Sequence, residues 1–443
     1  MHLRALLLFN FRRFKGQQPI VFQRELTIFA ANNGAGKTSV LDAIALALGA
    51  FLSRLPKLAG NALREQDICQ QRAIEAPFAI ISATTYGDDN RNIEATPLTR
   101  PANWHRIKAF QSNKANRDLA KKVAEQFGSE GLKEINILAD YIAENISSQV
   151  DFPVLAYYGT GRAILDIPQR RRGFGKDFPR LQAYADCLNP RTNFKKLFEY
   201  FYFLEDLERR EKIEKSDLNY ENGQLSAIRA AICEFLPEFS NPRTDIRPLR
   251  FLLDHATEGT TYSIDQLSDG YKTSLAMVMD IASRSVEANP HLGVDALKSS
   301  GIVLIDEIEL HLHPSWQQRI IPDLQRTFPN IQFICTTHSP QVLSTVPQAS
   351  IRTITNDGRV IEPKCKTYGA ESKRVLEELM QVSSRPPVHE KELREFIRIT
   401  DKGDWTSARY HELRKILICD LGESDPVIMD AEIKRNFQQL AAE

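Results

Sequence analysis

The feature of this sequence that most constrains its fold is a glycine-rich turn between an apolar strand and an apolar helix. Residues Gln23 to Ala31 read as the strand, and Ser39 to Leu52 read as an Ala/Leu-rich helix. The turn between them is Ala31-Asn32-Asn33-Gly34-Ala35-Gly36-Lys37-Thr38. The order strand, glycine-rich turn and helix is typical of the start of an α/β domain.

This turn fits the pattern of a phosphate-binding P-loop except at its first residue, Ala31, where glycine is usual. Gly34 and Gly36 allow backbone amides to close around phosphates, and the following helix N-terminus attracts anions. Lys37 is expected to reach the β- and γ-phosphates of ATP, and the Thr38 hydroxyl to bind Mg²⁺. If the backbone requires a positive φ at Ala31, the Cβ costs roughly 1 kcal/mol and weakens nucleotide binding or turnover. The expected nucleotide-binding positions are Ala31, Asn32, Asn33, Gly34, Ala35, Gly36, Lys37, Thr38 and Ser39.

A second apolar strand, Gly301 to Ile305, delivers two carboxylates at its carboxyl end, where open α/β sheets bind ligands. Asp306 suits the coordination sphere of Mg²⁺. Glu307 is placed to orient and deprotonate an attacking water, as a general base. The alternative is a pair of solvated acids that end a strand, but a P-loop in the same chain favours the catalytic interpretation.

Glu309, His311 and His313 alternate directly after these acids, a pattern that can suggest a metal site. Residues two apart converge on one metal only from a strand. Pro314 indicates a loop that leads into a helix, so we do not expect metal ligation here.

Further strands and helices alternate as far as Lys366, and the remaining residues are helical in pattern. Strands are expected at Leu3–Phe9, Phe78–Tyr86, Val154–Tyr158, Leu249–Leu253 and Ile331–Cys335, with an edge strand at Ser350–Asn356. Helices are expected at Asn193–Lys215, Ala227–Phe235 and Lys272–Glu287, with an antiparallel helical hairpin over Glu390–Leu421 and a last helix opened by Asp425-Pro426. We expect residues 1–99 and 251–365 to form the two parts of an α/β head, 100–250 an insertion with a helical lobe, and 366–443 a helical tail.

Composition narrows the class of protein. Lys+Arg 57 and Asp+Glu 57 give a formal net charge of zero, which argues against a wholly basic nucleic-acid coat. The apolar run Ala5 to Phe9 is too short for a signal peptide, and no stretch approaches the roughly 20 apolar residues of a membrane helix. The six cysteines form no CxxC pair, which indicates a reducing compartment. We therefore expect a cytoplasmic protein.

Two more motifs complete a resemblance to the ABC-type ATPases. Ser268 and Gly270 lie in Gln266-Leu267-Ser268-Asp269-Gly270-Tyr271-Lys272, which resembles the LSGGQ signature of that superfamily. His338 follows the next apolar strand, where the superfamily has its switch histidine. The order P-loop, signature, acidic strand and switch histidine is that of an ABC ATPase head. The opening Leu6-x-Leu8-x-Asn10-Phe11-Arg12 resembles the RecF/SMC branch, and the chain lacks the long heptad arrays of coiled-coil arms.

Finer matches are similar to the overcoming-lysogenization-defect-like ATPases of the AAA group, and most of all to the PtuA family of Septu antiphage systems. They are Ala156–Arg162, Leu267–Lys272 and Asp306–Pro314, and more loosely the tail from Gly403-Asp404-Trp405 to Leu421-Gly422. The resemblance implies an ATPase with Mg²⁺ that works with PtuB, an HNH nuclease that cleaves DNA. Related pairs serve as retron effectors, which adds a reverse transcriptase and its msDNA as partners.

The resemblance also implies a role for each matching residue. By this resemblance, Lys37 and Thr38 bind the nucleotide and Mg²⁺, and Asp306 also binds Mg²⁺. Glu307 would be the catalytic residue and His338 the switch. Ser268 and Gly270 would contact the γ-phosphate that is bound by a second copy. The chain would then form a head-to-head dimer with ATP between the heads, and a higher even oligomer. The Q-loop is not assigned by sequence, and Gln66 is the candidate.

Two other classes of function remain open. One is an ATPase that itself cuts DNA through a Toprim domain, or acts in DNA repair or recombination. A Toprim domain needs an acidic strand end and a D-x-D pair, and the mainly helical residues after His338 contain neither. The other is a scaffold that binds ATP but scarcely hydrolyses it.

Two basic stretches, Arg100–Lys122 and Arg162–Arg180, suggest contact with DNA, with solvated helix faces as the alternative. The apolar face of the tail is either a domain core or a surface for nuclease docking or subunit assembly. Its residues are Leu393, Phe396, Ile397, Leu413, Ile416 and Leu417.

Overall fold

The computed structural model describes residues 1–71, 74–87, 96–162, 179–190, 195–246, 249–355 and 357–440. They fall into two compact units, Met1–Ala370 and Glu371–Glu443. Among the described residues, no helix has the length and apolar character needed to cross a membrane.

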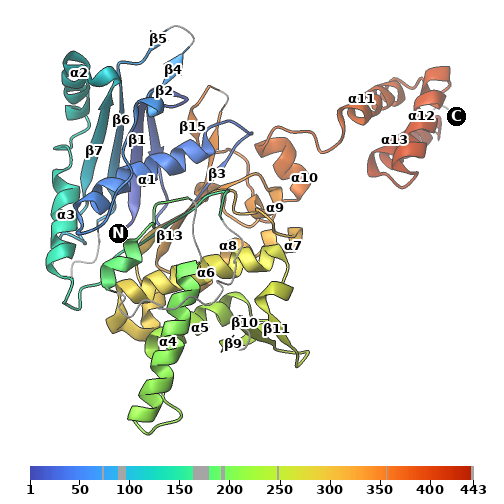
Figure 1. Cartoon of the computed structure of the whole chain (residues 1–443). Coiled ribbons are helices and arrows are strands. Elements are labelled where there is room, and N and C mark those ends of the chain that lie inside the picture. Colours follow the sequence, from blue (N-terminus) through green and yellow to red (C-terminus); the bar gives the residue numbers. More distant parts are fainter. Residues whose placement is uncertain are drawn as a thin grey trace. The chain divides into compact units, whose positions relative to one another are not determined.

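A six-stranded sheet with the order β15-β14-β3-β13-β12-β8 forms the centre of the first unit (Figure 1). Its strands are β3 (Leu26–Ala30), β8 (Val154–Tyr158), β12 (Gly301–Ile305), β13 (Ile331–Thr337), β14 (Ile351–Ile354) and β15 (Val360–Ile361). All neighbours are parallel except β14 and β15. Every residue of β3, β8, β12 and β13 is buried, as expected of parallel strands covered on both faces.

The prediction of an edge strand at Ser350–Asn356 is wrong in one respect. Strand β14 pairs with β3 on one side and with β15 on the other, so β15 is the edge of the sheet. The two-residue strand β15 is too short to give a sequence signal of its own.

A second, antiparallel sheet has the order β2-β1-β6-β7. Its strands are β1 (Leu3–Phe11), β2 (Phe14–Val21), β6 (Phe78–Thr85) and β7 (Asn103–Ala109). The P-loop helix α1 (Lys37–Arg54) shares one core with residues of both sheets, including Leu8, Ile81 and Leu304. Its Ala/Leu-rich sequence follows from that position, because a helix buried on most sides needs apolar residues all round. Helices α2 (Lys114–Glu125) and α3 (Lys133–Glu144) complete this part of the unit.

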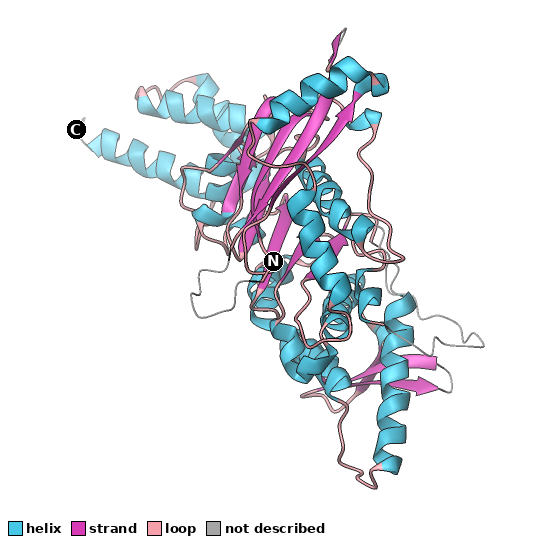
Figure 2. Ribbon diagram, turned by 90° about the vertical axis from the view of Figure 1, so that its left-hand side faces the viewer, coloured by secondary structure: helices cyan, strands magenta, loops and turns pink. Residues whose placement is uncertain are grey.

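A helical lobe with a small three-stranded sheet follows, and Figure 2 shows it gathered below the two larger sheets. Its helices are α4 (Lys195–Glu214), α5 (Gly223–Phe235), α6 (Asp269–Ala288), α8 (Ile320–Thr327) and the 3₁₀ segment η5 (Pro290–Lys298), and its strands are β9 (Phe239–Ile246), β10 (Leu249–His255) and β11 (Thr261–Ser263). The remaining short elements of the unit are η1 (Glu65–Asp67), β4 (Gln70–Gln71), β5 (Ile74–Glu75), η2 (Phe110–Ser112), η3 (Arg180–Tyr184), η4 (Ile264–Gln266), α7 (Pro314–Gln317), α9 (Pro340–Leu343) and η6 (Gln348–Ser350).

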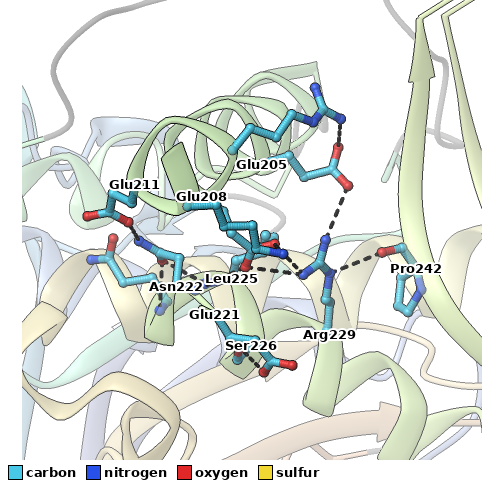
Figure 3. A network of polar contacts seen from close by, with 12 residues as sticks. Glu205, Glu208, Glu211, Glu221, Asn222, Leu225, Ser226, Arg229 and Pro242 are labelled. Carbon is cyan, nitrogen blue, oxygen red and sulfur yellow. Dashed lines mark hydrogen bonds and ion pairs between the residues drawn. The ribbon is translucent and has the colours of Figure 1, made fainter. Parts of the chain in front are cut away.

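A polar network joins α4 and α5 in this lobe (Figure 3). Arg229 on α5 lies between Glu205 and Glu208 of α4, at 3.4 Å and 3.1 Å. The two carboxylate residues are only 3% and 6% exposed. Glu205 also accepts hydrogen bonds from the backbone and side chain of Thr244 on β9. Burial raises the pKa of Glu205, and these hydrogen bonds and nearby arginines oppose that rise.

The second unit is helical, with α10 (Ser372–Arg374), the π-helical segment η7 (Val375–Leu379), α11 (Pro387–Asp401), α12 (Ala408–Leu421) and α13 (Pro426–Leu440). Helices α11 and α12 pack together, with Phe396 and Tyr410 stacked at 5.0 Å. The Asp425 carboxylate accepts a hydrogen bond from the Val427 amide at 3.0 Å and caps α13, which confirms the predicted start of the last helix.

Most of the apolar face predicted for the tail forms the core of the second unit. Leu393, Phe396, Leu413 and Leu417 are buried in this core, whereas Ile397 is 37% exposed. These four residues therefore hold the unit together. A separate exposed stripe follows α13 and consists of Met429, Ile433, Phe437 and Leu440.

Candidate functional site

The P-loop lies between β3 and α1, and its two inner glycines carry the unusual backbone angles. The φ angles of Gly34 and Gly36 are 72° and 102°. A Cβ at Gly36 would also lie 2.6 Å from Cδ of Arg13. Ala31 is not among the described residues with a positive φ. The conformational cost considered for Ala31 therefore does not arise, because the strained angles fall on glycines.

Lys37 begins α1 and turns its side chain back over the loop. Its Nζ donates to the carbonyl oxygens of Ala31 and Asn32 at 2.7 Å and 3.2 Å. The residue is 6% exposed. Burial lowers the pKa of Lys37, although the neighbouring carboxylates oppose that shift. The cation is thus held inside the loop that the sequence predicts will surround phosphates.

Thr38 and Asp306 meet at the carboxyl edge of the central sheet. The Thr38 hydroxyl donates to one carboxylate oxygen of Asp306 at 2.8 Å. The Thr336 hydroxyl, at the end of the intervening strand β13, donates to the other oxygen. Asp306 is 2% exposed. The parallel order β3-β13-β12 brings these residues together, since it places the carboxyl ends of the three strands at one edge.

Glu307 has a left-handed backbone, with a φ of 46°. Its amide donates to the Thr336 hydroxyl at 2.7 Å, and its carbonyl accepts from Nη2 of Arg162 at 2.9 Å. Nη1 of Arg162 donates to the carbonyl of Asp306 at 2.7 Å. Arg162 is 7% exposed, and burial lowers the pKa of its guanidinium although Asp306, Glu309 and Glu307 oppose that.

Sequence reasoning did not assign Arg162 a role in the site. The available signal was the turn Gly159-Thr160-Gly161-Arg162, which directly follows the apolar strand β8. Because β8 is the parallel neighbour of β12, its end reaches the acids that follow β12.

Glu309 holds the segment that carries His338. Its carboxylate accepts from the Thr337 hydroxyl at 2.7 Å and from the His338 amide at 2.5 Å. Burial lowers the pKa of His338, and the positive charge of Lys37 lowers it further, although the carboxylates of Glu309, Glu307 and Asp306 oppose the shift. The neutral form of the imidazole is therefore favoured beside the P-loop lysine.

Of the two histidines after the acids, His313 caps a helix. Nδ1 of His313 lies 2.9 Å from the Ser315 hydroxyl and caps the N-terminus of α7. His311 has a φ of 65°, and its carbonyl faces the signature segment. Within the described ranges, no cluster of three or more potential metal-ligating side chains is found.

The signature residues lie at the start of α6. Ser268 is the residue before the helix, and its side chain makes no capping hydrogen bond. A Cβ on Gly270 would lie 2.7 Å from the carbonyl oxygen of His311, so glycine allows α6 to approach the segment after the acids. The Tyr271 ring packs on Trp316 with centroids 4.4 Å apart. The start of the signature helix and the segment that follows Asp306 and Glu307 are therefore packed together.

Gln66, the Q-loop candidate, lies in η1 and lines a cavity of about 370 Å³ with Arg12, Asp42, Asp67 and Tyr157. Arg12 pairs there with Asp42 at 2.5 Å and with Asp67 at 3.0 Å. The Tyr157 hydroxyl donates to Asp42 at 2.8 Å. The polar groups of this cavity thus largely satisfy one another.

Not all the cations of the two basic stretches are available to bind DNA, because some are buried against backbone carbonyls. Arg106 donates to the carbonyls of Leu46 and Asn61 at 2.5 Å and 2.6 Å, and burial lowers its pKa. Arg180 likewise binds backbone carbonyls, and residues 163–178 of its stretch lie outside the described residues. The exposed cations of the first stretch are Arg100, Lys114, Arg117, Lys121 and Lys122.

Comparisons with known proteins find related sequences and a related structure. Residues 5–238 match a family model described as AAA domain, and residues 179–343 match one described as AAA ATPase domain. The chain is 31% identical over 478 residues to the "Retron Ec83 probable ATPase" of Escherichia coli, across 96% of this chain and 85% of that protein. It is 49% identical over 77 residues to the Septu protein PtuA of Bacillus mycoides (strain KBAB4), across 17% of this chain and 10% of that protein. An SmcHead bound to the C-winged helix domain of ScpA matches with a TM-score of 0.44 and 15% identity, over 82% of this chain and 98% of that chain.

Proposed function

The chain belongs to the AAA-domain ATPases, and we propose that it binds ATP and Mg²⁺ at the P-loop and hydrolyses ATP as the ATPase subunit of a defence complex. The retron ATPase of Escherichia coli matches nearly the whole chain, and the Septu protein PtuA matches a short part of it. The proposed defence role follows those relatives, and the proposed chemistry follows the residues of the site.

One observation carries the ATPase proposal: the 2.8 Å hydrogen bond between the Thr38 hydroxyl and the Asp306 carboxylate. It joins the P-loop to the acidic strand end, so two oxygen groups of the kind that Mg²⁺ prefers are neighbours. Thr38 and Asp306 would hold the ion. When bound, Mg²⁺ supplies positive charge that offsets the charge of the phosphates. Lys37, already over the loop, supplies the protein's own cation for the same purpose.

Glu307 is the proposed general base. Its backbone is held at both its amide and its carbonyl, which fixes where the side chain starts relative to Asp306. Fixed placement matters because a base must lie within hydrogen-bond reach of the water that it deprotonates.

The first experiment compares steady-state ATP hydrolysis and ATP binding in the wild type, Glu307→Gln and Lys37→Ala. We expect Glu307→Gln to lower kcat by about 10²–10⁴-fold, because it removes the base, and to keep ATP binding. Lys37→Ala is expected to lose ATP binding. Equal, near-background rates for the wild type and Glu307→Gln would contradict hydrolysis and leave only a binding role.

The proposal includes a head-to-head dimer in which Ser268 and Gly270 of one copy meet the nucleotide of the other. What supports it is that, among the described residues, no hydrogen bond joins Ser268 to the P-loop of its own chain. Light scattering after size exclusion should show a dimer of Glu307→Gln with ATP and a smaller species without it. Ser268→Arg should stay at the smaller mass with ATP. The mass of a single chain in all samples would contradict the dimer.

The partner that we propose is an HNH nuclease subunit, with DNA as the nuclease substrate. A pull-down of the tagged chain from its native operon, with intact-complex mass, tests this. A nuclease in fixed ratio with an even number of these chains would support the proposal. A bare dimer that cuts plasmid DNA would contradict it.

A further inference from the structure

Arg162 is a buried arginine whose hydrogen bonds go to backbone carbonyls of the acidic segment. Nη1 donates to Asp306 O at 2.7 Å and to Gly159 O at 3.3 Å, and Nη2 donates to Glu307 O at 2.9 Å. Its Nε is buried without a hydrogen-bond partner. A buried guanidinium with an unused donor is costly, so the position needs an explanation beyond packing.

The strands place Arg162 beside the acids. The Asp306 amide donates to the Tyr158 carbonyl at 2.8 Å, which extends the pairing of β8 and β12 by one residue. The chain then turns, since the Arg162 amide donates to the Gly159 carbonyl at 3.1 Å. Gly159 is packed closely here, because a Cβ would lie 2.6 Å from Cβ of Pro190. The turn therefore delivers the guanidinium to the backbone that follows β12.

Glu307 requires such support. A non-glycine residue with a φ of 46° occupies a sparsely populated region that costs of order 1–3 kcal/mol and persists only where surrounding contacts enforce it. Here the Thr336 hydroxyl accepts from the Glu307 amide, and Arg162 donates to the Glu307 carbonyl. The peptide groups on both sides of the Glu307 side chain are thus fixed by β13 and by the turn after β8.

We propose that Arg162 is a positioning residue for hydrolysis, which holds the Glu307 backbone in its left-handed conformation and so aims the Glu307 carboxylate. The inference rests on the proposed function, in which Glu307 is the base. Arginine suits the task because its planar fork donates to two adjacent carbonyls at once, which a lysine ammonium matches poorly. Arg162 touches neither the P-loop nor the signature through its hydrogen bonds, so nucleotide binding should not depend on it.

The kinetic test measures kcat, KM and the ATP dissociation constant for Arg162→Ala and Arg162→Lys. A displacement of the base by about 1 Å can cost roughly 10²-fold in rate, so we expect that loss in kcat for Arg162→Ala. KM and ATP binding should change less than about threefold, because Lys37 and Thr38 are untouched. Arg162→Lys should recover part of the rate.

Arg180→Ala is the matched control. Arg180 also donates to backbone carbonyls, at 2.7 Å to Ala288 and 2.6 Å to Ser148, but none of its partners is a site residue. It should lower stability and leave kcat unchanged. A normal kcat in Arg162→Ala, or a parallel loss of ATP binding, would overturn the positioning role.

A stability cycle tests the inference even if the wild type hydrolyses no ATP, in which case the proposed function alone would fail. Glycine adopts a positive φ without strain, so Glu307→Gly removes the strain that the Arg162 contact opposes and keeps the carbonyl that accepts the hydrogen bond. Chemical unfolding should show that Arg162→Ala costs more in the Glu307→Gly background than in the wild type, because in the wild type the lost contact is partly offset when Glu307 relaxes from its left-handed conformation. Equal costs in the two backgrounds would mean that Arg162 does not support the Glu307 conformation, and the inference would be wrong.

Discussion

At the scale of single residues, the close approach of two backbone segments decides which side chains the site can accept. Gly270 on α6 faces the carbonyl of His311, and an added Cβ would lie only 2.7 Å from that oxygen. Either α6 or the segment after the acids must then move. Gly223, at the start of α5, offers a contrast, because an added Cβ would meet its nearest atom at 3.4 Å.

We expect Gly270→Ala to lower the free energy of unfolding by about 1–3 kcal/mol, because backbone rather than a flexible side chain must yield. It should also reduce ATP turnover, since the displaced segment directly follows the acids. Gly223→Ala should stay within about 0.5 kcal/mol of the wild type. Denaturant titrations and steady-state rates for the two variants check this, and equal stabilities would contradict the close approach.

His338 is expected to make the free energy of unfolding depend on pH. Its folded-state pKa lies below the ordinary value of 6.5, so the unfolded chain binds a proton more readily. The free energy of unfolding should therefore fall as the pH drops below about 6.5 toward the folded-state pKa. His338→Gln removes this contribution and should flatten that part of the curve. Urea titrations from about pH 8 to pH 5.5 measure it, and identical curves for the two proteins would contradict the prediction.

At the scale of elements, a buried ionic network fixes α4 against α5 (Figure 3). Arg229 is the cation between Glu205 and Glu208, which are almost fully buried. A second ion pair on α4, Arg210 with Asp206 at 2.5 Å, has side chains 71% and 39% exposed. Helix α4 therefore takes part in two arginine ion-pair contacts that can be compared. In one the carboxylates are buried, and in the other both side chains are exposed.

We expect Arg229→Ala to cost about 1.5–3 kcal/mol, because two buried carboxylates lose the hydrogen bonds of their shared cation. Each carboxylate keeps a second cation, since Arg209 lies 3.7 Å from Glu205 and Lys212 lies 3.6 Å from Glu208. Arg210→Ala should cost less than about 1 kcal/mol, since water screens an exposed pair. Thermal and denaturant unfolding of both variants check the difference. Similar losses in the two would show that the network of Figure 3 does not hold the lobe together.

At the scale of the whole molecule, the chain divides between Ala370 and Glu371. Each unit has its own apolar core, and every residue of the candidate site belongs to the first. A chain ending at Ala370 should therefore fold and bind ATP with an affinity within about threefold of the full chain, because no site residue is lost. Circular dichroism and a binding titration test this. A truncated chain that folds but loses ATP binding would contradict it.

Much of the fold follows from local patterns. The expected α/β head with helical additions is confirmed, and so is the resemblance to the PtuA-type ATPases. Fully apolar segments such as Ile302–Ile305 predicted buried parallel strands because no polar face is possible there. The glycine-rich turn predicted the strand and the helix on either side of it, and both are present as β3 and α1. The roles of the individual site residues remain predictions.

What the sequence by itself determined is therefore the set of motifs and the kind of element that carries each one, because periodicity and turn chemistry act over a few neighbouring residues. Only the tertiary structure decided that Thr38 meets Asp306, that β15 covers β14, and that Arg162 holds the Glu307 carbonyl. These contacts depend on strand order, which joins residues far apart in the chain. The Arg162 contact also ends on backbone carbonyls, which every residue possesses, so no side chain in the sequence marks its partner.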